Sequence, residues 1–151
     1  MTKLFNYNQT LWVELTPSYS LSGGVYTYTY DLNNITSDKT IEEFILTLPG
    51  TVPVSGLGSI TGPSGWQGML RLGFNQVDWY NDTGSSILPG HTGTFTFTST
   101  FGPSTEAIAG AACQNAVGLS GSTFSPVPEP GSLVAFATGL IGLIGLKLRR
   151  R

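Results

Sequence analysis

The side chains that most often carry out catalysis are scarce in this chain. A serine hydrolase needs a histidine base, an aspartate that orients it and a serine nucleophile. The one histidine, His91, lies in a Pro-Gly-His-Thr-Gly stretch typical of a turn, and no Gly-x-Ser-x-Gly motif occurs. The single cysteine, Cys113, has alanine neighbours that indicate a small buried thiol, and nothing local supports a pair between it and His91. We therefore expect no catalytic residues, which leaves a small hydrolase as the weakest of the functions considered.

Residues that bind metals are equally sparse. A zinc site needs three or four Cys, His or carboxylate ligands, and one histidine with one cysteine makes the chain a poor candidate. Calcium prefers clustered carboxylate, amide and carbonyl oxygens. Two segments offer a few such oxygens, namely Asp31 with Asn33 and Asn34, and Asn81 with Asp82. Neither has the spacing of a known calcium loop, and Asn and Asp are common in turns, so we predict no metal and no cofactor.

One carboxylate has aromatic neighbours that suit a sugar. Asp78 precedes Trp79 and Tyr80, and aromatic rings stack on sugars while a carboxylate accepts hydrogen bonds from their hydroxyls. Because successive strand residues face opposite sides, Trp79 is in phase with Val77 and is expected in the core. Asp78 and Tyr80 would then face outward as a small candidate for glycan contact.

A row of three tyrosines is the second candidate for glycan contact. Tyr26, Tyr28 and Tyr30 alternate with Thr27 and Thr29, so the three rings share one face of a predicted strand. Such a row is more often half-buried sheet packing. Exposed on a flat sheet, it would instead form an aromatic platform for a polysaccharide.

Alternation with period two dominates residues 9–105 and predicts the elements that must position these side chains. Gly23-Gly24 is expected to begin the tyrosine strand, and Leu11, Val13 and Leu15 suggest an earlier edge strand. Further strands are predicted from inward-facing residues in four segments: Phe44, Leu46 and Leu48; Leu70, Leu72 and Phe74; Val77 and Trp79; and Phe95, Phe97 and Phe101. Short strands separated by Gly- and Pro-containing turns indicate an all-β, antiparallel β-sandwich.

The sequence changes character after residue 105. Residues 105–119 are rich in alanine and fit either a last strand or a short helix, and a strand is favoured because the other elements are strands. Residues 118–130 are rich in Gly, Ser and Pro and predict a flexible linker. We thus expect a sandwich over residues 1–117, a linker over 118–130 and a separate C-terminal segment over 131–151.

The C-terminal segment combines an apolar run with a basic cluster. Leu133–Leu146 is 14 residues without charge, which as a helix would reach roughly 21 Å, short of a hydrocarbon core of about 30 Å. Lys147, Arg149, Arg150 and Arg151 follow, and such residues stay on the cytoplasmic side of a membrane. These features predict one marginal transmembrane helix, with the preceding 130 residues outside. A buried core helix is less favoured, because the run has only Thr138 as a polar residue.

Together with Val127-Pro128-Glu129-Pro130, this arrangement resembles the PEP-CTERM sorting signal of bacterial surface proteins. The resemblance covers about the last 25 residues. It implies recognition by an exosortase, a membrane cysteine transpeptidase that is thought to cut near the motif. It further implies a transient stay in the inner membrane, a Gram-negative-type host that makes extracellular polysaccharide, and a final place at the cell surface or in the matrix.

A second, looser resemblance covers residues 9–105. Tyr26–Tyr30, Gly65-Trp66, Val77–Trp79 and Ile87–Gly90 look like parts of the immunoglobulin- or fibronectin-like ectodomains associated with this sorting signal. The resemblance implies a sandwich without an assigned activity.

The net charge and the N-terminal residues give two further predictions. The first 130 residues hold three basic and nine acidic residues, a net charge of −6, which argues against binding nucleic acid or anionic lipid. Residues 1–8 contain no apolar stretch of a secretory signal, so we expect the true N-terminus to be longer. The sequence thus predicts an exported, non-enzymatic surface or matrix protein, with a carbohydrate-binding module as the alternative.

Overall fold

A computed structural model of the chain describes residues 2–5, 12–35, 39–50, 52, 54–113 and 117–127. These residues form ten β-strands and two single-turn 3-10 helices. In chain order they are β1 (Thr2–Phe5), β2 (Trp12–Ser22), β3 (Val25–Asn33), β4 (Ile41–Thr47), η1 (Val54–Gly56), β5 (Gly58–Thr61), β6 (Trp66–Arg71), η2 (Leu72–Phe74), β7 (Gln76–Asn81), β8 (Thr92–Ser99), β9 (Gly102–Cys113) and β10 (Val117–Val127). The all-β prediction is confirmed.

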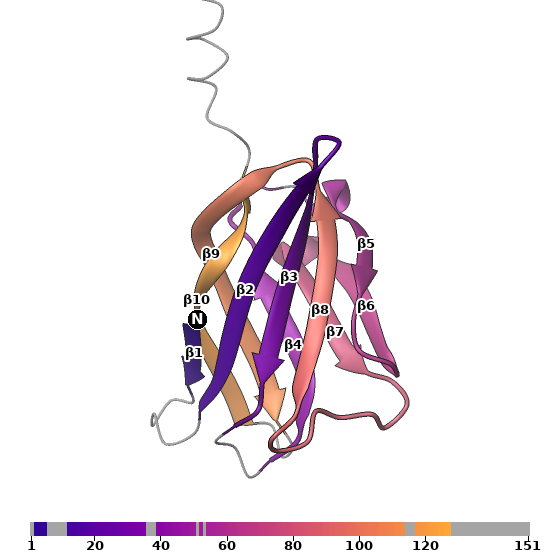
Figure 1. Cartoon of the computed structure of the whole chain (residues 1–151), viewed down its shortest axis with the longest axis vertical. Coiled ribbons are helices and arrows are strands. Elements are labelled where there is room, and N and C mark those ends of the chain that lie inside the picture. The colour runs from indigo at the N-terminus through magenta and orange to yellow at the C-terminus, as the bar shows by residue number, and fades with distance from the viewer. Residues whose placement is uncertain are drawn as a thin grey trace, which may run out of the picture.

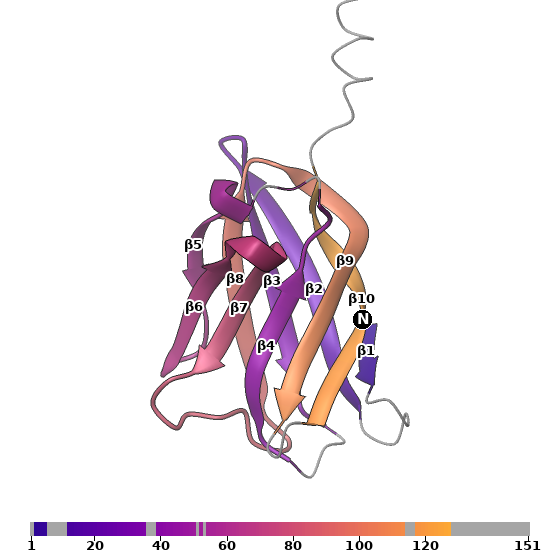
Figure 2. The same ribbon diagram turned by 180° about the vertical axis from the view of Figure 1, so that it is seen from behind.

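All strand pairs are antiparallel, and the strands follow the order β5-β8-β3-β2-β1-β10-β9-β4-β7-β6. The sheet folds back on itself into two layers. Strands β2, β3, β8 and β5 form the layer nearest the viewer in Figure 1, and β9, β4, β7 and β6 form the layer that faces the viewer in Figure 2. The two layers enclose the apolar core, as in a β-sandwich.

The core is built from the inward-facing residues that alternate along the strands. Tyr30, Phe44 and Phe97 have no exposed surface, nor have Trp79 and Phe95. The Phe44 ring stacks on Trp79 with 5.4 Å between ring centroids, and it lies 4.8 Å from Phe95 by the same measure. These contacts join β4, β7 and β8 across the sandwich.

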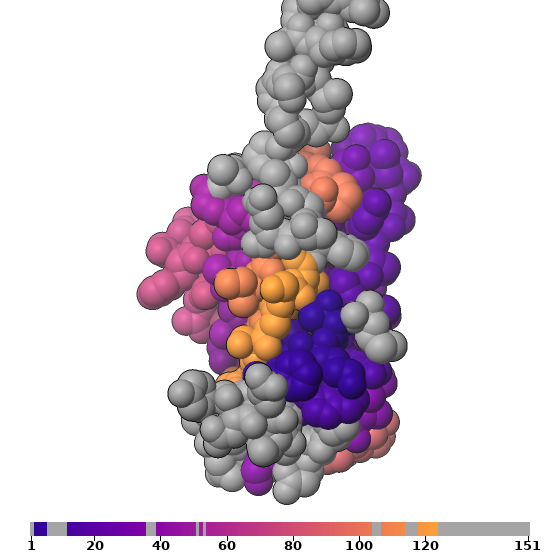
Figure 3. Space-filling view, turned by 90° about the vertical axis from the view of Figure 1, so that its left-hand side faces the viewer, coloured from indigo at the N-terminus to yellow at the C-terminus, as the bar shows by residue number. Residues whose placement is uncertain are grey.

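Two glycine positions show how the backbone permits this packing. Gly23 and Gly24 have φ angles of 57° and 79°, the left-handed pair that a two-residue hairpin turn requires, and they join β2 to β3 as predicted. At Gly121 of β10, a Cβ atom would lie 2.7 Å from the carbonyl oxygen of Lys3. Glycine therefore lets β1 lie against β10. Figure 3 shows β1, in indigo, directly beside the orange strands β9 and β10.

The predicted linker differs from what the structure places there. Residues 118–127 belong to β10, which pairs with β9 over its length and with β1 at Ser120. Leu119 and Thr123 are buried while Gly118 and Ser120 are exposed, so the segment alternates like any other strand. Its small residues reflect the close approach of β1 rather than a lack of structure. The strand favoured for residues 105–119 is present as β9 and the start of β10.

Two further expectations are corrected by the structure. β2 is an interior strand, flanked by β1 and β3, and not an edge strand. Leu72 and Phe74 were expected on the inward face of a strand, but they lie in η2, where they are 66% and 70% exposed. The chain leaves β6 at Arg71 and turns through Asn75, whose φ of 53° is left-handed, so the alternation of Leu70, Leu72 and Phe74 spans a turn.

Candidate functional site

The tyrosine row runs from the core towards one end of the sandwich. Tyr30 and Tyr28 are fully buried, whereas Tyr26 is partly exposed. The Tyr28 ring stacks on Phe97 at 5.1 Å between centroids, and its hydroxyl donates a hydrogen bond of 2.8 Å to the carbonyl oxygen of Phe101. Two rings of the row are thus structural, and only its outer end is open to a ligand.

Burial also decides the chemistry of these tyrosines. It is the main reason that the pKa values of Tyr28 and Tyr30 lie well above that of a free tyrosine. Other tyrosines nearby raise both further, since a second phenolate would repel the first. The two hydroxyls therefore stay protonated and act as packing groups, not as acids or bases.

Asp78 lies on the outward face of β7 as predicted, but it is not exposed. Its side chain has no solvent-accessible surface, because Arg71 from the neighbouring strand β6 lies over it. The Arg71 guanidinium Nε donates a hydrogen bond to Asp78 Oδ2. Asp78 Oδ1 is buried as well and has no hydrogen-bond partner among the described residues. The expectation of an accessible Asp78 is therefore wrong, and a sugar hydroxyl would have to displace Arg71 to reach it.

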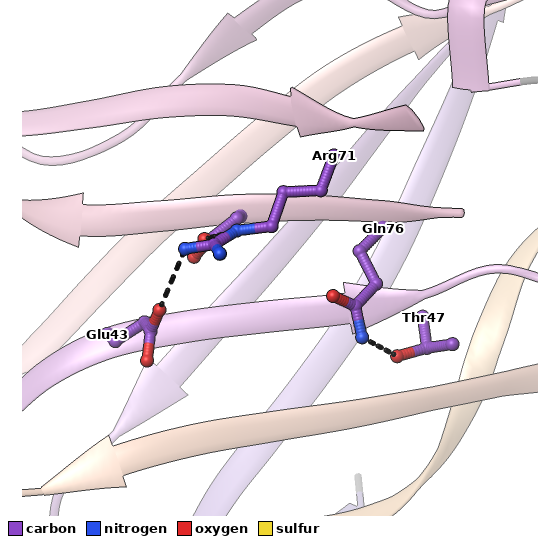
Figure 4. Close-up of polar contacts among 5 residues, drawn as sticks. Glu43, Thr47, Arg71 and Gln76 are labelled. Carbon is purple, nitrogen blue, oxygen red and sulfur yellow. Dashed lines mark hydrogen bonds and ion pairs between the residues drawn. The ribbon is translucent and has the colours of Figure 1, made fainter. Parts of the chain in front are cut away.

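Arg71 joins a second carboxylate to this cluster. Its Nη2 atom lies 3.6 Å from Glu43 Oε1 on β4, so the guanidinium reaches across β7 (Figure 4). Partial burial and, next, the charge of Asp78 raise the pKa of Glu43, while Arg71 opposes the shift. In the next row, Gln76 Nε2 donates a 3.0 Å hydrogen bond to Thr47 Oγ1. The cluster thus ties β6, β7 and β4 together on their outward face.

The way the charges pair in this cluster favours a stabilising role over a catalytic one. Acid–base catalysis by two carboxylates needs both to reach a substrate, and here one of them is sealed beneath an arginine. Tyr80, the other predicted outward residue, is half-buried and pairs in register with Glu43. Sequence reasoning missed Arg71, although its place one hairpin before Asp78 was a usable signal.

Three of the residues considered for calcium make side-chain hydrogen bonds within the protein. Asn34 donates from Nδ2 to the carbonyl oxygens of Lys39 and Ile87, at 2.8 and 3.0 Å. Asn81 Nδ2 donates to Glu42 and Ser86, and Asp31 accepts a hydrogen bond from Thr94. In the part of the chain that the structure describes, no three His, Cys, Asp or Glu residues converge as metal ligands would.

His91 and Cys113 lie in different surroundings. His91 is exposed in the turn before β8, where its Nδ1 lies 3.2 Å from the carbonyl oxygen of Pro89. Cys113 is 3% exposed at the end of β9. The predictions of an exposed turn histidine and a buried thiol are both confirmed.

The sorting residues predicted from the sequence begin where the described structure ends. Val127 is the last residue of β10 and pairs with Gly102, the first residue of β9. Pro128, Glu129 and Pro130 lie outside the described residues, as do Lys147 and Arg149–Arg151. No helix within the described ranges has the length and hydropathy needed to cross a membrane.

Comparison with solved structures defines the class of fold. An uncharacterized protein from Nocardia farcinica, reported to have an immunoglobulin-like fold, superposes with a TM-score of 0.53 at 13% identity, over 77% of this chain and 97% of that one. A cohesin module of a Clostridium perfringens family 33 glycoside hydrolase gives a TM-score of 0.45 at 8% identity, over 78% and 99% of the respective chains. The first of these matches shows that the sandwich is immunoglobulin-like, as the second resemblance implied. No curated protein matches the sequence.

The C-terminal resemblance is also confirmed. Residues 126–151 match the PEP-CTERM protein-sorting motif. The chain thus joins an immunoglobulin-like sandwich to a PEP-CTERM sorting signal. Such a signal marks an exported protein that is routed through the membrane to the cell surface and handled by an exosortase.

Proposed function

We propose that this chain is a non-enzymatic surface or matrix protein whose C-terminal segment inserts transiently as a membrane helix. An exosortase-type transpeptidase then cuts near Pro128-Glu129-Pro130, and the sandwich is released or attached outside the cell. The observation that carries the proposal is the sorting motif at residues 126–151. The apolar run from Leu133 and the basic cluster from Lys147 supply the insertion and its orientation.

The place of the motif relative to the fold supports the cleavage step. β10 ends at Val127, one residue before Pro128. A cut after the motif would thus remove none of the described strands. The ladder between β10 and β9 reaches Val127 and Gly102, which fixes the start of the motif at one end of the sandwich. A protease-like partner could approach that end without unfolding the domain.

Mass spectrometry of the protein recovered from the cell surface tests this proposal. Peptides should end near the motif, with none beyond about Gly131, and an intact Arg151 terminus at the surface would contradict cleavage. The variant Pro128→Ala with Glu129→Ala should remain uncut in the inner membrane. A matched control replaces an exposed proline and acid at the far end of the sandwich, Pro89→Ala with Asp82→Ala, and should be processed normally.

Binding to extracellular polysaccharide is the weaker candidate. Of the five residues considered for glycan contact, Tyr28, Tyr30 and Asp78 are buried. Tyr26 and Tyr80 retain partial exposure, so they are the residues through which a glycan would have to bind. A polysaccharide pull-down comparing the native chain with Tyr26→Ala and Tyr80→Ala addresses this function, and binding that neither change weakens would exclude these sites.

A further inference from the structure

The two ends of the sandwich differ sharply in charge. One end carries the β2–β3 hairpin, η1, η2 and the β8–β9 connection (Figures 1 and 2). The segments that form it contain no Asp, Glu, Lys, Arg or His: residues 19–27, 54–60, 72–75 and 97–103. Arg71 directly precedes η2, but its guanidinium pairs with Asp78 and Glu43. A hollow of about 270 Å³ lies there between Val25, Leu57 and Thr100, again without a charged lining residue. We call this the uncharged end.

The opposite end is acidic and polar. It holds Asp31, Glu42 and Asp82 around the turns that join β3 to β4 and β7 to β8, with Lys39 as the basic residue of those described segments. Glu42 accepts hydrogen bonds from Asn81, Thr40 and Ser86, and these contacts lower its pKa. An ionised carboxylate is best solvated by water and is repelled by an anionic surface.

The uncharged end also exposes large apolar side chains. Leu72 and Phe74 of η2 are the most exposed large hydrophobic residues described, at 66% and 70%, and Leu21 and Tyr19 of β2 are 57% and 51% exposed. The Tyr19 ring lies 6.1 Å from that of Tyr26, edge to face. Tyrosines with a buried side and a wet side are typical of the boundary between membrane and water.

The sorting tail leaves the sandwich at this same end. A Cβ atom on Gly102 would lie 3.5 Å from the hydroxyl of Tyr26, and Gly102 pairs with Val127. Six residue steps separate Val127 from Leu133, the first residue of the apolar run. Even fully extended they reach only about 20 Å. The uncharged end therefore cannot move far from the point at which the tail would enter a bilayer.

We infer that, before cleavage, the uncharged end lies against the lipid surface, so that the sandwich stands upright with its acidic end in water. The inference rests on the proposed insertion of the tail and adds a second, weaker membrane contact through Tyr19, Leu21 and η2. The occupant is a lipid bilayer and not a soluble protein, because the short tether brings the bilayer there and an anionic surface disfavours carboxylates. Cutting the tail would leave this contact too weak to hold the protein.

The experiment uses the full chain in vesicles of phosphatidylethanolamine and phosphatidylglycerol. Cysteines introduced one at a time at Ser22, in the hairpin, and at Thr92, at the acidic end, carry an environment-sensitive fluorophore. Both positions are exposed, and the unsubstituted chain with its buried Cys113 reports background labelling. We expect a blue shift and quenching by lipid-borne spin labels at Ser22, and neither at Thr92.

A matched pair of variants tests which side chains make the contact. Leu21 is 57% exposed at the uncharged end and Leu88 is 51% exposed near the acidic end. Leu21→Glu should abolish the shift and the quenching at Ser22, and Leu88→Glu should leave both unchanged. Equal quenching at Ser22 and Thr92, or quenching that survives Leu21→Glu, would overturn the inference.

Vesicle flotation separates this result from the proposed function. A chain that does not float with vesicles contradicts tail insertion itself. A chain that floats while Ser22 stays unshifted keeps the proposed function and refutes the membrane contact, which leaves the uncharged end for a protein partner.

Discussion

Each face of β7 carries buried side chains, but those side chains are buried by different means. On the inner face, Val77 and Trp79 pack among aromatic rings of the core. On the outer face, Asp78 is sealed by the guanidinium of Arg71, which also approaches Glu43. Burial on the inner face is favourable in itself, since it removes apolar area from water. Burial of a carboxylate is tolerated only while its partner remains in place.

The contrast implies different tolerance to mutation. An inner position loses more stability the larger the volume removed, when a smaller apolar side chain replaces the native one. The buried outer carboxylate depends on its charged partner, so removing both partners can cost less than removing one. Variants along β6 and β7 can therefore distinguish the two kinds of burial.

Trp79→Ala should give the largest loss. Its ring stacks on Phe44 and contacts Phe95 and Phe97, and its Nε1 donates a 2.9 Å hydrogen bond to the carbonyl oxygen of Thr61. Removing a buried tryptophan costs about 3–5 kcal/mol, a large part of the stability of a small domain. Urea unfolding of the sandwich measures this cost, and a loss no greater than that of an exposed substitution such as Leu88→Ala would show that the inner face is loosely packed.

Arg71→Met should lower the free energy of unfolding by a smaller amount, about 2 kcal/mol, because it leaves Asp78 buried without its charged partner. Arg71 itself is 44% exposed, so little of the loss comes from packing of its own side chain. The double variant with Asp78→Asn should recover part of the stability, and a double-mutant cycle gives the coupling between the two residues. Independent, additive effects would mean that Arg71 does not stabilise Asp78.

The inner face is the part that the sequence predicts best. Period-two alternation places Phe44, Leu46, Val77 and Trp79 correctly because the core admits only apolar residues at those positions. The outer face is harder to predict, because the same alternation indicates that Asp78 faces outward without showing that Arg71 covers it. That contact depends on the register between β6 and β7, where Met69 lies opposite Asp78, and the register depends on a turn through Leu72–Asn75 that resembles strand sequence.

The small residues of β10 are a second feature that the sequence does not predict correctly. Gly118, Gly121 and the nearby serines are typical of a linker by composition, but β10 uses them to lie close to β1 and to pair with β9. Composition describes a segment by itself, whereas the close approach of the Lys3 carbonyl involves residues more than a hundred positions away. The sorting motif was predictable for the opposite reason, because its signal lies entirely in local sequence.

Tyr28→Phe tests a polar group on the inner face of β3. It should lower the free energy of unfolding by a smaller amount, about 1 kcal/mol. The change keeps the ring that stacks on Phe97 and removes the hydroxyl that donates to the Phe101 carbonyl oxygen. Thermal unfolding should show a modest fall in Tm with the fold retained. A loss approaching that of Trp79→Ala would show that the hydrogen bond, and not the ring, holds the β8–β9 connection to β3.

Adjacent glutamates on β4 should show the smallest effects, with opposite dependence on pH. Hydrogen bonding, first from Asn81, lowers the pKa of Glu42, so its contribution is present above its unfolded pKa and is lost as the pH falls through the folded value. Burial and Asp78 raise the pKa of Glu43, so the folded state binds a proton more readily than the unfolded one. Its ionisation therefore reduces stability as the pH rises above the unfolded pKa, about 4.3, through the higher folded value.

Urea unfolding between about pH 3 and pH 7 separates the two residues. Glu43→Gln should remove the decline above the unfolded pKa, and Glu42→Gln should reduce the gain seen on leaving acid. Glu14→Gln offers a control on β2, in the opposite layer. Equal pH profiles for the Glu42 and Glu43 variants would show that the Asp78–Arg71 cluster does not reach Glu43, and the outer face would then depend on one ion pair alone.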